Sequence, residues 1–190
     1  MSFNELMQQA IKIRTETDAK LRVDFDARAK FQQTSLFATE EVRQGRKLPF
    51  EGRISVSVEL KNKGNEQFLA AQVTEACHTY EQALAVLWYI ENRDPNWKNS
   101  GIKDEDLVEV NYSAEEGSEQ ERLEVRDLKV SLLLNIARAY YKLGDCSTSS
   151  EACTQALATD PSCAKALYCR AQASVTPASS GAYEADKAIR

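Results

Sequence analysis

The chain has no long apolar run and no apolar segment at its N-terminus. Its longest purely apolar stretch, residues 83–90, is much shorter than the roughly 20 residues of a membrane-spanning helix. The first residues, MSFNELMQQ, lack the basic and then apolar pattern of a secretory signal. We therefore expect a cytoplasmic or nucleocytoplasmic protein that has no membrane partner.

An excess of positive charge is also missing, because the formal net charge is −5 at pH 7. Nucleic-acid-binding surfaces are typically basic, so this balance argues against a nucleic acid as partner. The acidic side chains gather in residues 104–124, where Arg122 is the only base. We interpret that segment as a solvated loop.

The cysteines form no recognisable metal or disulfide pattern. They are odd in number, none is paired in a CxxC motif, and His78 is the only histidine of the chain; the five are Cys77, Cys146, Cys153, Cys163 and Cys169. We expect them to be reduced and to act as small packing residues. The sequence thus predicts neither a metal nor another cofactor.

Catalytic motifs are absent from the sequence too. It contains no nucleotide-binding loop, no nucleophile with a matching base and no motif of paired carboxylates. His78 follows Cys77 on an expected helix, where we interpret it as a packing or surface residue. These observations favour a binding module and argue against an enzyme.

What the chain does have is a pattern of small and apolar residues between Lys129 and Ala171. In a frame with Pro161 at position 32, positions 4, 8, 11, 15 and 27 are Leu133, Ala137, Tyr140, Gly144 and Ala156. Small residues at positions 8 and 27 allow two antiparallel helices to approach closely, and the Asp160-Pro161 step ends the second helix. This spacing resembles the tetratricopeptide repeat (TPR).

One such unit cannot bury its apolar face alone, and the same frame fits on both sides of it. Residues 54–92 form a first repeat with Gly64 at position 8, residues 121–161 the second, and residues 162–190 a third that is incomplete. Residues 93–120 are the acidic loop between the first two. The third repeat departs from the pattern in its long turn, VTPASSG, before Ala188. Because the sequence stops inside an expected helix, we expect a fragment or a later segment that closes the array.

The resemblance implies an all-α fold, a right-handed TPR superhelix preceded by an N-terminal helical segment. In the first repeat we expect helices at residues 54–70 and 73–92. Upstream, residues 2–33 have an interrupted apolar stripe at helical spacing and predict one long helix, and a second, shorter helix is expected at residues 35–44. We interpret residues 1–53 as a segment that caps or docks on the array; a dimerising coiled coil is the alternative.

The lengthened helices and the inserted loop resemble the TPR domains of the large immunophilins and of the aryl-hydrocarbon-receptor-interacting protein. Co-chaperones of that group hold the acidic C-terminal tail of a heat-shock chaperone in a carboxylate clamp. The clamp positions correspond here to Lys61, Asn65, Asn135, Lys165 and Cys169. Four of these match the family pattern, and Cys169 stands where the family has arginine. Arg138 and Arg170 are auxiliary candidates.

The chemistry of these residues fits the ligand that the resemblance implies. Residues four apart share one face of a helix, so Lys61 and Asn65 form one pair and Lys165 and Cys169 another. Asn135 lies in the apolar run LLLNIA, where an amide is costly unless it faces a groove or a partner. The sequence therefore predicts a co-chaperone that binds a chaperone tail. A different peptide ligand, a purely structural array, and an assembly factor that uses its N-terminal helix remain alternatives.

Overall fold

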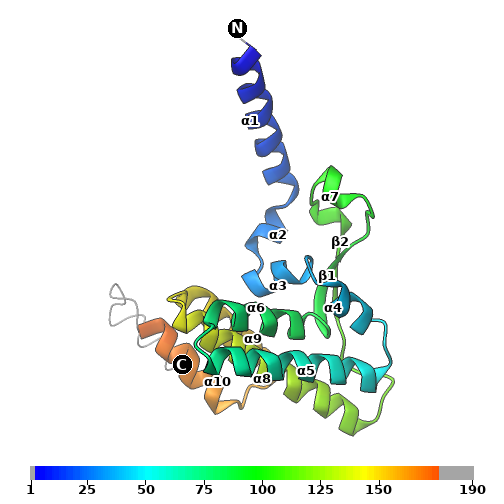
Figure 1. The fold of residues 1–190 in the computed structure, drawn as a ribbon, viewed down its shortest axis with the longest axis vertical. Coiled ribbons are helices and arrows are strands. Elements are labelled where there is room, and N and C mark those ends of the chain that lie inside the picture. The colour runs from blue at the N-terminus through cyan, green and yellow to red at the C-terminus, as the bar shows by residue number, and fades with distance from the viewer. Residues whose placement is uncertain (1–2, 176–190) are drawn as a thin grey trace.

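The computed structural model describes residues 3–175 (Figure 1). The second helix expected in the third repeat, with Ala188 and nearly all of the expected VTPASSG turn, falls outside the described residues. The described elements are α1 (Phe3–Leu21), α2 (Val23–Ala27), α3 (Lys30–Ser35), α4 (Glu40–Gly45), α5 (Phe50–Leu69), α6 (Val73–Leu84), β1 (Trp88–Asn92), α7 (Trp97–Ser100), η1 (Asp104–Asp106), β2 (Leu107–Asn111), α8 (Glu119–Lys142), α9 (Cys146–Thr159) and α10 (Ala164–Val175).

The helices form a TPR-type array, which confirms the expected all-α class. Helices α5 and α6 make one hairpin, α8 and α9 make the next, and α10 packs against α9 as the first helix of a further unit. Helix α6 also packs against α8, so one core runs through both hairpins. Figure 1 shows the hairpins side by side. In the part of the chain that is described, no helix is both long and apolar enough to cross a bilayer.

Small residues bring the paired helices together, as the repeat frame predicts. In the second hairpin, Ala137 and Ala156 are fully buried. In the first, a Cβ atom at Gly64 would lie 2.6 Å from the Tyr80 ring. Any side chain at that position would therefore push the tyrosine away, so glycine is what lets α5 and α6 approach this closely.

The expected extension of the second helix to Asn92 is wrong, since α6 ends at Leu84. The chain then enters β1, which pairs antiparallel with β2. Two tertiary hydrogen bonds use backbone groups that a continuing helix would need: Arg46 Nε donates to the Ala85 carbonyl at 2.8 Å, and the Ile90 N–H donates to Ser35 Oγ at 2.9 Å. Strand β2 lies within residues 93–120, so part of the expected acidic loop is a β-strand.

The single N-terminal helix expected at residues 2–33 is also wrong, because α1, α2 and α3 are separate. Asp104 of the inserted segment accepts the backbone N–H groups of Asp24 and Phe25 at 2.8 and 2.9 Å, which fixes the first turn of α2. Phe25 is buried against Leu36 and Ile90. The inserted segment therefore supplies the contacts that bend the N-terminal chain away from one continuous helix.

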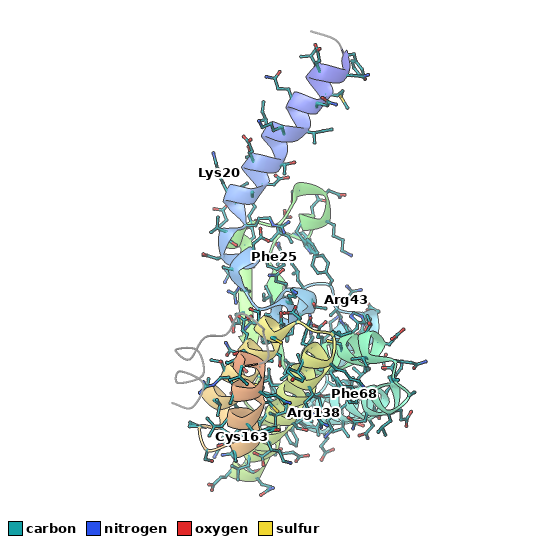
Figure 2. The ribbon with its side chains drawn as sticks, turned by 90° about the vertical axis from the view of Figure 1, so that its left-hand side faces the viewer. Lys20, Phe25, Arg43, Phe68, Arg138 and Cys163 are labelled. Atoms are coloured by element: carbon teal, nitrogen blue, oxygen red, sulfur yellow. The ribbon has the colours of Figure 1, made fainter. Side chains whose placement is uncertain are left out.

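The rest of the N-terminal segment divides into a packed part and a projecting part. Helix α3 packs against α6 and β1, and α4, which Thr39 caps, packs against α5. The short helix expected at residues 35–44 corresponds to α4, but it begins five residues later, at Glu40, since Ser35 is the last residue of α3. Helix α1 extends away from the repeats (Figures 1 and 2), and it exposes large apolar side chains, among them Phe3, Leu6, Met7, Ile11 and Ile13.

Candidate functional site

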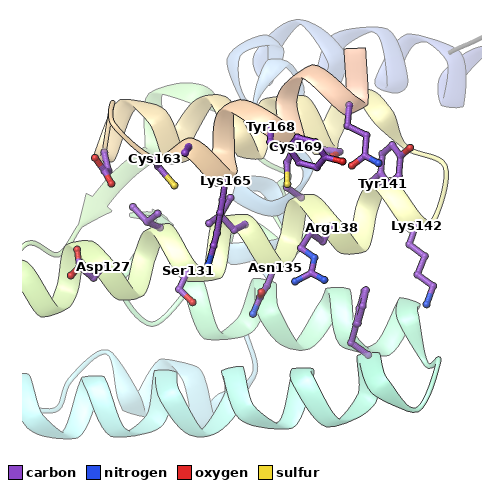
Figure 3. Close-up of a pocket in the computed structure, with 18 residues that line it drawn as sticks. Asp127, Ser131, Asn135, Arg138, Tyr141, Lys142, Cys163, Lys165, Tyr168 and Cys169 are labelled. Atoms are coloured by element: carbon purple, nitrogen blue, oxygen red, sulfur yellow. The ribbon is translucent and has the colours of Figure 1, made fainter. Parts of the chain in front are cut away.

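A groove with a volume of about 1050 Å³ runs between α8 and α10 and reaches Phe68 of α5 (Figure 3). The first helix of each successive repeat contributes to it. Because α5, α8 and α10 are these first helices, the groove lies on the side of the array where the TPR frame places a ligand. On α8 its lining residues run from Asp127 to Lys142.

Helix α8 presents two rows of side chains to this groove. A polar row consists of Asp127, Ser131, Asn135, Arg138 and Lys142, and an apolar row consists of Val130, Leu134, Ala137 and Tyr141. Spacings of three and four residues keep each row on one face of the helix. Figure 3 shows Asn135, Arg138 and Lys142 directed towards α5, below Lys165 of α10. The groove therefore has polar groups along one wall and apolar groups along its floor.

The structure brings together some of the predicted clamp residues and not others. Asn135, Lys165 and Cys169 line the groove, as does the auxiliary candidate Arg138. Lys61, Asn65 and Arg170 are not among the lining residues. Asn65 nonetheless contacts the site, because Asn135 Nδ2 donates to Asn65 Oδ1 at 3.2 Å. Lys61 lies one helical turn before Asn65 on α5, outside the lined volume.

The two asparagines at the centre of the groove are held in a fixed arrangement. Tyr80 donates its hydroxyl to Asn65 Oδ1 at 2.8 Å, and the same oxygen accepts from Asn135. An amide oxygen has two lone pairs, so these two bonds satisfy it. The Nδ2 group of Asn65 and one N–H of Asn135 are left as donors for a ligand oxygen.

Three cationic side chains in the groove have no acidic partner. Among residues 3–175, no carboxylate lies within ion-pair distance of Arg138, Lys142 or Lys165. Arg138 and Lys142 instead approach the Phe68 ring, with 5.8 and 4.9 Å to its centroid. The concentration of uncompensated positive charge in one groove of an acidic protein favours an anionic ligand.

Cys169 occupies the place of the arginine in the family pattern, and Arg138 lies near it. Burial raises the pKa of the Cys169 thiol, while the Arg138 guanidinium acts in the opposite direction. The thiol therefore remains neutral near physiological pH. A permanent charge is missing from α10 at this point, but α8 supplies a guanidinium on the facing wall.

Sequence reasoning missed Phe68 and Lys142 as groove residues. Both could have been found from spacing, since Lys142 lies four residues after Arg138 and Phe68 lies three residues after Asn65. The acidic end of the groove was missed as well. Asp127 on α8 and Asp160 between α9 and α10 line that end, where Asp160 also accepts from Ser162.

No family model and no curated protein matches the sequence. Among solved structures, the chain is similar to the C-terminal TPR-containing domain of a Plasmodium falciparum protein described as an FK506-binding protein. The two are 23% identical with a TM-score of 0.48, over 66% of this chain and 68% of that chain.

Proposed function

We propose that this chain is a protein interaction module of the co-chaperone kind, whose groove binds the acidic C-terminal tail of a heat-shock chaperone. The observation that carries this proposal is the set of three uncompensated cations, Arg138, Lys142 and Lys165, beside a pair of ordered amides. Carboxylate oxygens accept from both kinds of donor, and hydrogen bonds to a charged group contribute about 1.5–3 kcal/mol each.

Each donor has a distinct part in the proposed clamp. Asn65 and Asn135 hold one carboxylate through their free N–H groups, and Lys61 adds a charge from the side of α5. Lys165 contacts a second carboxylate from α10. Arg138 takes over the role that an arginine at position 169 has in the family pattern, because it reaches the groove next to Cys169.

The test is calorimetry with a short peptide ending in Glu-Glu-Val-Asp, compared with the same peptide carrying a C-terminal amide. We expect the free acid to bind at least tenfold more tightly, since the amide lacks one of the two carboxylates that the clamp engages. Binding should weaken as salt is raised. Equal affinity of the two peptides, or no binding of either, would contradict the proposal.

A second candidate function rests on α1 and not on the groove. This helix projects from the body of the protein (Figure 1), and its exposed apolar side chains include Phe3 at 76% and Ile13 at 60%. Such a stripe suits an assembly factor that docks through its N-terminal helix or pairs with a second copy. Light scattering and complex formation of an Ile13→Asp variant would test this role, while peptide binding in the groove should be unchanged.

A further inference from the structure

The polar row on α8 changes its charge steadily along the helix. It begins with acidic Asp127, passes through the neutral Ser131 and Asn135, and ends with Arg138 and Lys142. All five side chains line the same groove, and Figure 3 shows them in this order from one end to the other. The groove is therefore electrically asymmetric along the direction in which an extended ligand would lie.

Groups from the other elements reinforce each end. At the basic end, Phe68 of α5 lies against both Arg138 and Lys142 and shields one side of them from water. At the acidic end, Asp160 adds a second carboxylate. Arg126 offsets part of this negative charge by donating two hydrogen bonds to Asp127. Both bonds reach Oδ1, and neither uses the other carboxylate oxygen, Oδ2.

We infer that the groove reads the direction and charge pattern of its ligand: the partner is an extended peptide with an acidic C-terminus at Arg138 and Lys142 and a basic residue at Asp127. This inference rests on the proposed function and adds to it a second recognition element at the opposite end. A ligand that is acidic throughout would place like charges against Asp127 and Asp160, which is unfavourable.

The length of α8 sets the spacing between the two recognition elements. Asp127 and Arg138 are eleven positions apart, and a rise of about 1.5 Å per residue separates them by roughly 16 Å. An extended peptide advances by about 3.3 Å per residue, so this distance corresponds to about five ligand residues. The basic residue of the ligand is therefore expected about five positions before its acidic C-terminal residue.

The apolar row specifies what lies between these two ends. Val130, Leu134 and Ala137 form the floor of the groove, and Cys169 leaves more room above it than an arginine would. Small or apolar ligand side chains fit against this floor, and a basic side chain is disfavoured there because Lys165 reaches the middle of the groove from α10 (Figure 3). The inferred ligand is thus basic, then apolar, then acidic.

The experiment uses two fluorescent hexapeptides that end in Val-Glu-Asp with a free carboxylate. One begins with Lys-Ala-Ala and the other with Glu-Ala-Ala. Anisotropy titrations at low salt should give at least about a threefold preference for the lysine peptide, the size expected for an exposed charge pair. The preference should shrink as salt is added.

The matched variants are Asp127→Lys in the groove and Glu75→Lys on α6, which makes the same change of charge at an exposed position that does not line the groove. The Asp127 side chain is 67% exposed, so its replacement leaves the core intact. We expect Asp127→Lys to reverse the preference and Glu75→Lys to keep it. Equal binding of the two peptides to the unchanged protein, or an unaltered preference in Asp127→Lys, would overturn the inference while the proposed function stands. Binding of neither peptide would overturn both.

Discussion

The first hairpin (α5 and α6) and the second (α8 and α9) are both pairs of helices packed through small residues, but they differ at their turns. At equivalent places of the repeat frame, the first hairpin has Ala71 with φ of 61° and the second has Gly144 with φ of 83°. In the second turn Asp145 also caps α9 by accepting from the Thr148 N–H at 3.0 Å, whereas Gln72 provides no side-chain cap for α6. The same turn is thus formed with well-suited residues in one repeat and with strained ones in the other.

This difference shows that helix packing determines the hairpin and that the turn adapts to it. Left-handed backbone costs a residue with a side chain about 1–2 kcal/mol. The close contact between Gly64 and Tyr80, together with the buried Ala76 and Ala83, holds α5 and α6 in place despite that cost. Packing should therefore be more sensitive to mutation than the turns are.

The largest effect is expected from Gly64→Leu in the first hairpin. The leucine side chain would displace the Tyr80 ring, and overpacking of this kind lowers the unfolding free energy by about 3 kcal/mol. Chemical denaturation should show this loss of unfolding free energy relative to Lys63→Leu, a control at the exposed neighbouring position. A difference of less than about half a kcal/mol between the two variants would mean that Gly64 does not set the helix contact.

An intermediate effect is expected when the two turns exchange residues. Gly144→Ala should lower the unfolding free energy by about 1 kcal/mol, because alanine is strained at this positive φ. Ala71→Gly should raise it by a smaller amount, since relief of strain is partly offset by the greater freedom of glycine in the unfolded chain. Thermal unfolding would measure both. If Gly144→Ala and Ala71→Gly changed the unfolding free energy equally and with the same sign, the two positions would not share a preference for glycine.

A smaller and pH-dependent effect is expected at the contact between the hairpins. Tyr140 of α8 donates to Glu81 of α6 at 2.5 Å, and burial raises the pKa of the Glu81 carboxyl, while Tyr140, Thr34, His78 and Lys30 oppose the shift. A raised pKa means that the folded protein holds this proton more tightly than the unfolded chain. The stability that the protonated carboxyl contributes is therefore fully present at low pH and is lost as the pH rises from the ordinary glutamate range through the raised pKa.

Glu81→Gln should remove that dependence, because the amide is neutral at every pH and can still accept from Tyr140. Denaturation at several pH values between about 4 and 7 should show a smaller decline for this variant than for the unchanged protein. Glu75→Gln, an exposed glutamine substitution on the same helix, serves as the control. Parallel pH profiles for Glu81→Gln and the unchanged protein would contradict this explanation.

The sequence predicts the hairpins better than the segments between them. Small residues at fixed spacing, such as Gly64 and Ala137, act locally within a pair of helices and can be recognised directly. The strand after Leu84 depends on β2 and on Arg46, which are distant in sequence, and the breaks around α2 depend on Asp104. Helical periodicity alone gives no sign of such long-range partners. It therefore predicts too long a helix both at residues 73–92 and at residues 2–33.

The same reasoning explains what could be predicted of the candidate site. Asn135 was recognisable as an amide within an apolar run, and Lys165 followed from the repeat frame. The contact of Phe68 with Arg138 and Lys142 joins different helices and depends on how α5 packs beside α8. Whether Lys61 takes part in binding stays a prediction, because it lies outside the lined groove.

The most direct test of the central claim is the affinity of Lys165→Ala for the peptide ending in Glu-Glu-Val-Asp, measured by calorimetry beside Lys63→Ala. Both changes remove one exposed lysine, but only Lys165 lines the groove. We expect Lys165→Ala to weaken binding about tenfold, equivalent to roughly 1.4 kcal/mol, and Lys63→Ala to bind as the unchanged protein does. Unchanged affinity in Lys165→Ala, or an equal loss in both variants, would contradict the claim that this groove holds an acidic tail.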